Sequence, residues 1–143
     1  MPDVFYHGAA PPTDPVALKR LAVDSRRDAI LTGGFAHDFG GSTGVKVLQT
    51  RESDETNWLT LQNSCIAAVM AGQGATVGAV IRTADNVNVA LSYADGLQVM
   101  LAMAAWGAAV YAASWKLKDA ITAALDQASL DAIDITAGWP ANP

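Results

Sequence analysis

The 143-residue sequence has little of the chemistry that builds small bridged or metal-bound domains. It holds one cysteine, Cys65, and two histidines, His7 and His37. A single cysteine cannot form a disulfide within the chain, and the two histidines lack the short ligand spacing of a zinc site. The sequence therefore predicts a fold that depends on its own core, with no metal and no cofactor.

Charge is also scarce. Charged residues make up 16% of the chain, against about 25% in an average soluble domain, while 51% of residues are hydrophobic. The formal net charge is -5, and the nine Lys and Arg residues are scattered. An acidic chain without a basic cluster argues against a nucleic-acid partner. The hydrophobic excess is hard to bury in so small a monomer, so we expect a homo-oligomer or association with other proteins.

Few residues offer catalytic chemistry. Glu occurs only at positions 52 and 55, and no pair of carboxylates has a spacing that suggests acid and base roles. Cys65 with His37 is the best combination of nucleophile and base, but no third residue is placed to orient them. A thiol on an apolar helix stripe and a histidine in a hairpin are ordinary structural roles. We therefore predict that the protein is not an enzyme and assign no catalytic residue.

Capping and turn signals predict an α+β fold of three helices and two β-hairpins. Helices are expected at 15–31, from 53 or 54 to 70, and from 93 to about 125, the last long and Ala-rich; the hairpins are expected at 35–50 and 77–91. Thr13 or Asp14 followed by Pro15 marks the first helix start, and Ser92, three residues before Asp95, marks the last. Residues 1–14 are expected to form an extended N-terminal arm, and residues 15–128 the compact domain. A last turn is expected between 126 and 135, and residues 129–143 are expected to form an extended C-terminal tail.

The first residues lack the basic and apolar regions of a signal peptide, which predicts folding in the cytoplasm.

Residues 96–115 carry no charge over a length that could span a membrane. Ala is the commonest residue in this segment, polar and small residues interrupt it, and only two lysines follow, so we predict burial in protein and no membrane partner. Two interpretations remain open: the helix is covered by its own domain, or its small residues admit a second copy or a neighbouring protein. The predicted interface residues are the aromatic ones on the long helix, the arm and the tail: Trp106, Tyr111, Trp115, Phe5, Tyr6 and Trp139.

The order of these elements, with two short motifs, resembles a known family. The hairpin sequence IRTADNVNV at 81–89 and the helix ending LKDAI at 117–121 are similar to the phage domain of unknown function found in proteins associated with tail fibres and their assembly. The resemblance covers roughly 18–133 and omits the arm and the tail. It transfers no active site and implies a structural or adaptor component of a bacteriophage tail, at the baseplate or fibre attachment. Such a chain would be made in the host cytoplasm, pack against other tail or fibre proteins and remain in the virion. A tail-fibre assembly chaperone that leaves the finished particle is the alternative.

Overall fold

The computed structural model describes residues 13–142 and confirms the predicted α+β class. Three helices of sixteen or more residues, a short fourth helix and two antiparallel hairpins make up the described chain. Their bounds are α1 Pro15–Thr32, β1 Phe35–Asp38, β2 Val45–Leu48, the 3₁₀ helix η1 Glu52–Asp54, α2 Glu55–Met70, β3 Val77–Arg82, β4 Asn88–Ser92, α3 Tyr93–Ala123 and α4 Gln127–Asp131.

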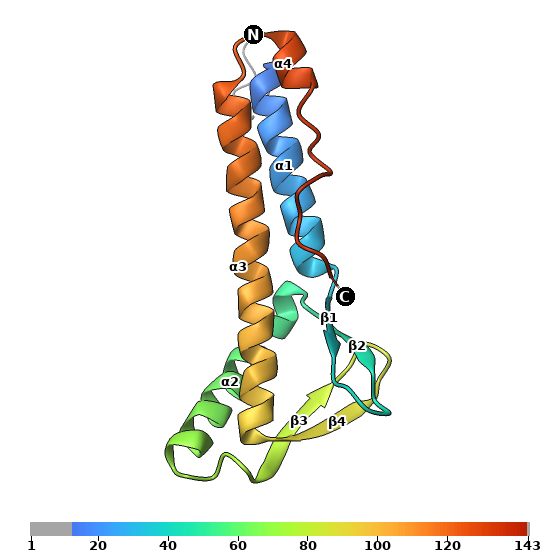
Figure 1. Cartoon of the computed structure of the whole chain (residues 1–143), viewed down its shortest axis with the longest axis vertical. Coiled ribbons are helices and arrows are strands. Elements are labelled where there is room, and N and C mark those ends of the chain that lie inside the picture. Colours follow the sequence, from blue (N-terminus) through green and yellow to red (C-terminus); the bar gives the residue numbers. More distant parts are fainter. Residues whose placement is uncertain (1–12, 143) are drawn as a thin grey trace, which may run out of the picture.

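Helix α3 is the central helix of the molecule. Its 31 residues span about 46 Å at 1.5 Å per residue. Figure 1 shows α1 running antiparallel beside its upper part, α2 against its lower part, and both hairpins gathered at the lower end. Helix α4 lies at the top, and the C-terminal segment returns down the side of α1 (Figure 1). The lower and upper parts of α3 therefore have different neighbours.

Both predicted helix starts are confirmed by their caps. The Asp14 carboxylate accepts hydrogen bonds from the backbone N–H groups of Val16 and Ala17, and Pro15 occupies the first helical position, where it loses no hydrogen bond. At the start of α3, Ser92 Oγ accepts from the Asp95 N–H at 3.1 Å. These caps supply partners for N–H groups that would otherwise face the helix end unpaired.

The two hairpins are separate two-stranded sheets that are tied together at one loop. In the first, Phe35 pairs with Leu48, and in the second, Ile81 pairs with Val89. The backbone N–H of Ala84, in the second hairpin turn, donates to the Val47 carbonyl at 2.7 Å. The connection fixes the hairpins against each other beneath α3.

Three buried clusters follow α3 from bottom to top. The lowest joins the hairpins to the start of α3, the middle one joins Phe35 to Trp106 and Val110, and the upper one joins Val23, Ile121 and Leu130. Because α3 contributes to all three, it links otherwise small clusters into one core.

The C-terminal residues pack against the upper and middle clusters. Leu130 is buried, Trp139 contacts both clusters, and the Asn142 side chain bonds the Ala36 N–H and the Gly34 carbonyl at 2.8 and 2.9 Å. The packed part of the molecule thus extends through residue 142, past the boundary expected at 128. The sequence pattern missed this because the segment is irregular and its contacts are to residues about one hundred positions away.

Candidate interaction surface

Opposite sides of α3 are both apolar, but only one is covered. The buried side carries Val99, Trp106 and Val110, at helical spacing. The opposite side is an exposed stripe at steps of three and four residues, here called the α3 outer stripe: Leu101, Ala105, Ala108, Ala112 and Trp115. Leu101 is 48% exposed and Trp115 59% exposed. A solvent-facing helix side normally carries charged and polar residues, so this stripe is unusual.

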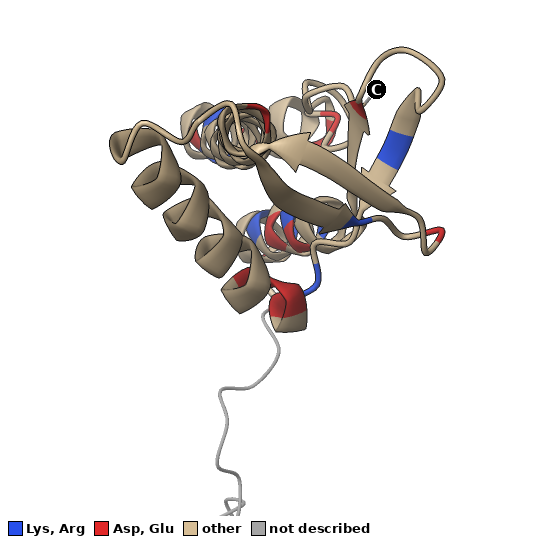
Figure 2. Cartoon of the chain, turned by 90° about the horizontal axis from the view of Figure 1, so that it is seen from below, with Lys and Arg blue, Asp and Glu red and all other residues tan. Residues whose placement is uncertain are grey.

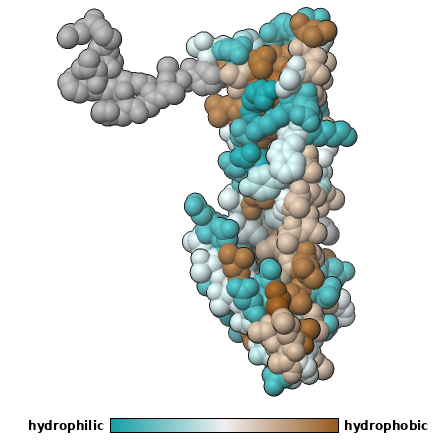
Figure 3. Space-filling view, turned by 90° about the vertical axis from the view of Figure 1, so that its left-hand side faces the viewer, coloured by the Kyte–Doolittle hydropathy of each residue, from teal (hydrophilic) through white to brown (hydrophobic). Residues whose placement is uncertain are grey.

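Helix α2 is covered even less. Cys65 is its one buried residue, and Ile66, Val69 and Met70, which follow it, are exposed. Figure 2 shows that acidic residues mark only the start of α2 and that the rest of its ribbon carries no charge. In Figure 3, apolar residues run down much of the face toward the lower end, while hydrophilic residues gather nearer the upper end. The lower part of the molecule therefore presents apolar surface on two helices.

A groove of about 620 Å³ lies where the end of α1, the start of α2 and the middle of α3 meet. Its walls include Leu31, Trp58, Leu59, Met103 and Tyr111. Trp106 also lines this groove, and its indole N–H is buried without a hydrogen-bond partner among residues 13–142. A concave site with mostly apolar walls is suited to an apolar occupant.

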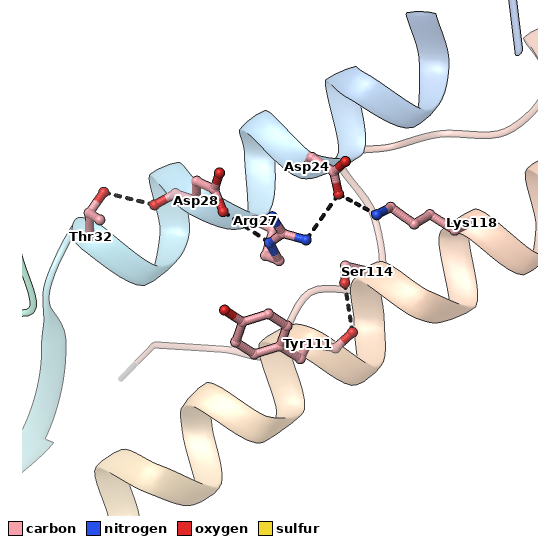
Figure 4. Close-up of polar contacts among 7 residues, drawn as sticks. All are labelled: Asp24, Arg27, Asp28, Thr32, Tyr111, Ser114 and Lys118. Carbon is pink, nitrogen blue, oxygen red and sulfur yellow. Dashed lines mark hydrogen bonds and ion pairs between the residues drawn. The ribbon is translucent and has the colours of Figure 1, made fainter. Parts of the chain in front are cut away.

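A polar seam holds α1 against the upper part of α3 (Figure 4). Asp24 forms ion pairs with Arg27, at 3.0 Å, and with Lys118 of α3. The Arg27 guanidinium also lies 5.4 Å from the centre of the Tyr111 ring, a cation–π contact. A hydrogen bond to Asp28 raises the pKa of Arg27 above its ordinary value, so the guanidinium stays charged. The seam orients Tyr111, the aromatic residue at the edge of the groove.

The predicted interface residues fall into three groups. Trp106 is 8% exposed and Trp139 is half-buried, and both pack within their own chain, where Trp139 Nε1 donates to the Ile135 carbonyl at 2.8 Å. Tyr111 and Trp115 are exposed and close together, with ring centroids 6.2 Å apart. Phe5 and Tyr6 lie outside the described residues. The structure thus brings one aromatic pair to the surface.

The residues considered for catalysis have separate surroundings. Cys65 is fully buried beside α3, and burial raises the pKa of its thiol, which disfavours the reactive thiolate. His37 lies between the rings of Phe35 and Phe39, at 5.9 and 4.8 Å. Within residues 13–142, no three His, Cys, Asp or Glu side chains are grouped to hold a metal ion.

Sequence reasoning missed the polar seam. In this seam, Lys19 donates to the Leu130 carbonyl, Arg20 donates to Thr122, and Asp24 pairs with Lys118. The spacing of Asp24 and Arg27 could have revealed their ion pair, because residues three apart are neighbours on a helix. Nothing in the sequence indicates which distant residue on α3 completes the seam.

Helix α3 is also long and apolar enough to cross a membrane by length and composition alone. In its most apolar 18-residue window, 33% of the residues are buried inside the structure, and the core helix of a soluble protein meets the same criteria. Within the described chain, Lys118 of α3 pairs with Asp24 of α1, and α3 also contacts α2 and both hairpins.

Comparison with known proteins gives one match. No curated protein and no solved structure matches the chain. A family model matches residues 14–137, which is most of the chain and includes every described helix and strand. The chain therefore belongs to the family described as "Domain of unknown function (DUF4376)".

Proposed function

We propose that the protein acts without catalysis, by packing its uncovered apolar helix surfaces against other protein chains. The observation that carries the proposal is the α3 outer stripe, where a long central helix presents Leu101, three alanines and Trp115 to solvent. The alanines allow a close approach of a second backbone, and the two larger side chains supply apolar area at its ends. The uncovered residues of α2 add a second surface of the same kind.

The energetics favour covering this surface. Burying a large apolar side chain contributes about 1.5–3 kcal/mol, and Leu101 and Trp115 are each only about half buried already. Covering these two residues and the alanines between them therefore contributes a few kcal/mol to the free energy of association, from which the entropic cost of association must be subtracted. A second copy of the chain or a neighbouring protein could supply the cover, which is why a homo-oligomer is part of the proposal.

For the biological setting, we propose a bacteriophage tail, at the baseplate or the fibre attachment. Support comes from the order of helices and hairpins and from the two motifs at 81–89 and 117–121, which resemble the tail-fibre-associated domain. The chain would be made in the host cytoplasm, remain in the virion and contact other tail or fibre proteins, with no role for nucleic acid or membrane. An assembly chaperone is the second candidate, because exposed apolar stripes also suit transient binding of a fibre. Mass spectrometry of purified virions separates the two: a structural component is present in the particle, and a chaperone is absent.

The association itself is tested by light scattering of the purified protein. We expect a mass that is a multiple of 14.8 kDa. Leu101→Glu, which introduces a charge into the α3 outer stripe, should shift the mass toward the monomer. Ser25→Glu is the matched control, because it adds the same charge at an exposed polar position on α1 rather than on the α3 outer stripe. A wild-type monomer at all concentrations, or equal behaviour of the two variants, would refute packing through this stripe.

A further inference from the structure

The groove between α1, α2 and α3 has aromatic and aliphatic walls, and charged side chains line it as well. We propose that this groove binds a segment of a partner protein in which an arginine or lysine stands next to an apolar residue. No residue of the α3 outer stripe lines the groove. The inference therefore goes beyond the proposed function, because it adds a second site that recognises a different kind of chemistry.

The charges that line the groove are mainly negative. Three carboxylates and one guanidinium are present: Asp28, Glu52, Glu55 and Arg51. Asp28 pairs with Arg27 at 2.9 Å, and Arg51 pairs with Asp54 at 2.9 Å. Glu52 and Glu55 are both exposed and form no ion pair with another side chain of residues 13–142. Two carboxylates of the groove are therefore open to a cation from outside.

These two glutamates lie together with an aromatic ring. Glu52 and Glu55 are three residues apart across η1 and the start of α2, and Trp58 follows after three more, so the three side chains are neighbours on one side of the helix. The indole N–H of Trp58 donates to the Gln49 carbonyl at 2.8 Å, which fixes the ring. Figure 2 shows these acidic residues at the start of α2. Carboxylates beside an aromatic face attract a guanidinium or ammonium group.

The groove also contains an unpaired donor. Trp106 lines it and is 8% exposed, and its indole N–H is buried without a hydrogen-bond partner among residues 13–142. A buried donor without an acceptor is rare in folded proteins and unfavourable. A peptide backbone brings carbonyl acceptors into the groove, whereas a simple cation brings none. This donor therefore favours a peptide over an isolated cation.

The other walls suit an apolar side chain. Leu31, Leu59, Met103 and Tyr111 line the groove, whose volume of about 620 Å³ is typical of a ligand site. Methionine side chains are flexible and adapt to different apolar shapes. A segment with an apolar residue beside a cationic one therefore uses the apolar walls and the two glutamates at the same time.

The test is an NMR titration of the full-length protein with two short peptides, each acetylated and amidated at its ends. Leu-Arg-Leu carries a cation between two apolar residues, and Leu-Glu-Leu carries a carboxylate in its place. The chain has four tryptophans, of which Trp58 and Trp106 line the groove. We expect Leu-Arg-Leu to produce its largest indole N–H shifts at these two residues, and Leu-Glu-Leu to leave both signals in place.

A pair of variants tests the role of the glutamates. Glu52→Gln with Glu55→Gln should weaken the binding of Leu-Arg-Leu about fivefold, because two exposed ion pairs are lost. Asp119→Asn with Asp131→Asn is the matched control, since it removes the same charge at exposed positions outside the groove. This control should bind the peptide as the wild type does.

Four outcomes overturn the proposal. The first three are equal affinity for the two peptides, equal affinity of the two double variants, and an unchanged Trp106 signal. The fourth comes from butylguanidinium, which has the cation and an apolar stem but no peptide carbonyl. If it shifts both signals at the same concentration as Leu-Arg-Leu, the groove binds free organic cations rather than a protein segment. The titration does not depend on the oligomeric mass, so it succeeds or fails separately from packing through the α3 outer stripe.

Discussion

The two halves of α3 are held by different kinds of contact. In the upper half, charged and polar side chains of α1 cross to α3 and α4, with Asp24 paired to Lys118 and Arg20 bonded to Thr122. In the lower half, no side-chain hydrogen bond or ion pair joins α2 to α3 within the described chain, and the helices meet through apolar contact. There, a Cβ added to Gly96 would lie 2.6 Å from Ala79 Cβ and 3.2 Å from Cys65 Sγ.

The difference has a consequence for the outer surfaces. A seam of ion pairs fixes one register of α1 against α3, because a shift by one residue would separate the charges. The apolar contact between α2 and α3, here called the apolar seam, depends on shape alone. Both of these helices also carry exposed apolar residues. Uncovered hydrophobic surface lies along α2 and along the α3 outer stripe, which runs from Leu101 in the lower half to Trp115 in the upper half, and these two surfaces are where we expect partner chains to pack.

The largest effect is expected from the upper core. Ile121→Ala removes three buried carbon atoms between Val23 and Leu130 and should cost about 3 kcal/mol of unfolding free energy. Leu125→Ala, four residues later on an almost fully exposed side chain, should change it by less than about 0.5 kcal/mol. Urea unfolding followed by far-UV circular dichroism measures both. Equal losses would show that burial in the upper cluster does not determine stability there.

The second prediction concerns the apolar seam and uses two glycines of the same helix. Gly96→Ala should lower the unfolding free energy by about 2 kcal/mol, because the added methyl group forces α3 away from β3 and α2. Gly107→Ala should raise it by up to about 1 kcal/mol, since nothing lies within 4 Å of the new Cβ and alanine is the better helix former. Thermal unfolding of the two variants should therefore move in opposite directions. A stabilising Gly96→Ala would mean that the seam is looser than its geometry indicates.

The polar seam should contribute less than either core. Asp24→Asn removes the charge shared by Arg27 and Lys118 and should cost about 1 kcal/mol, because all three side chains are partly exposed to solvent. Added salt should shrink the difference between variant and wild type, as it screens the ion pairs. Asp119→Asn, on the exposed side of α3, is the control and should leave stability nearly unchanged. A loss that is insensitive to salt would show that packing, rather than charge, holds α1 in place.

The contrast between the halves also explains what the sequence could predict. Local signals gave the elements: the Asp14 and Ser92 caps start α1 and α3, and the alternating residues of both hairpins form strands close to the expected bounds. The exposed pair Tyr111 and Trp115 lies among the predicted interface residues. Contacts between distant segments left no local signal, so the partners of Asp24 on α3 and of Asn142 beside β1 were not predictable from spacing.

Acid is expected to weaken both halves by a small amount. The pKa of Asp54 is lowered by its hydrogen bond from Arg51, and that of Asp85 by its hydrogen bond from Lys46, both in the lower half. In the upper half, hydrogen bonds from Ser129 and Thr136 lower the pKa values of Asp126 and Asp134. A folded-state pKa below the unfolded value of about 3.9 stabilises the protein above that pH, and the contribution is lost as pH falls through the folded-state value.

The check is the urea midpoint measured from pH 6 down to pH 3, which should stay level and then decline below about pH 4. Asp126→Asn keeps an amide oxygen that can accept from the Ser129 N–H but no longer titrates, so its midpoint should decline less steeply than that of the wild type. Asp126→Ala removes the cap as well and should lower the midpoint already at pH 6. If Asp126→Asn declines as steeply as the wild type, the carboxylate at the start of α4 contributes nothing to the acid response, and the response comes from the remaining carboxylates.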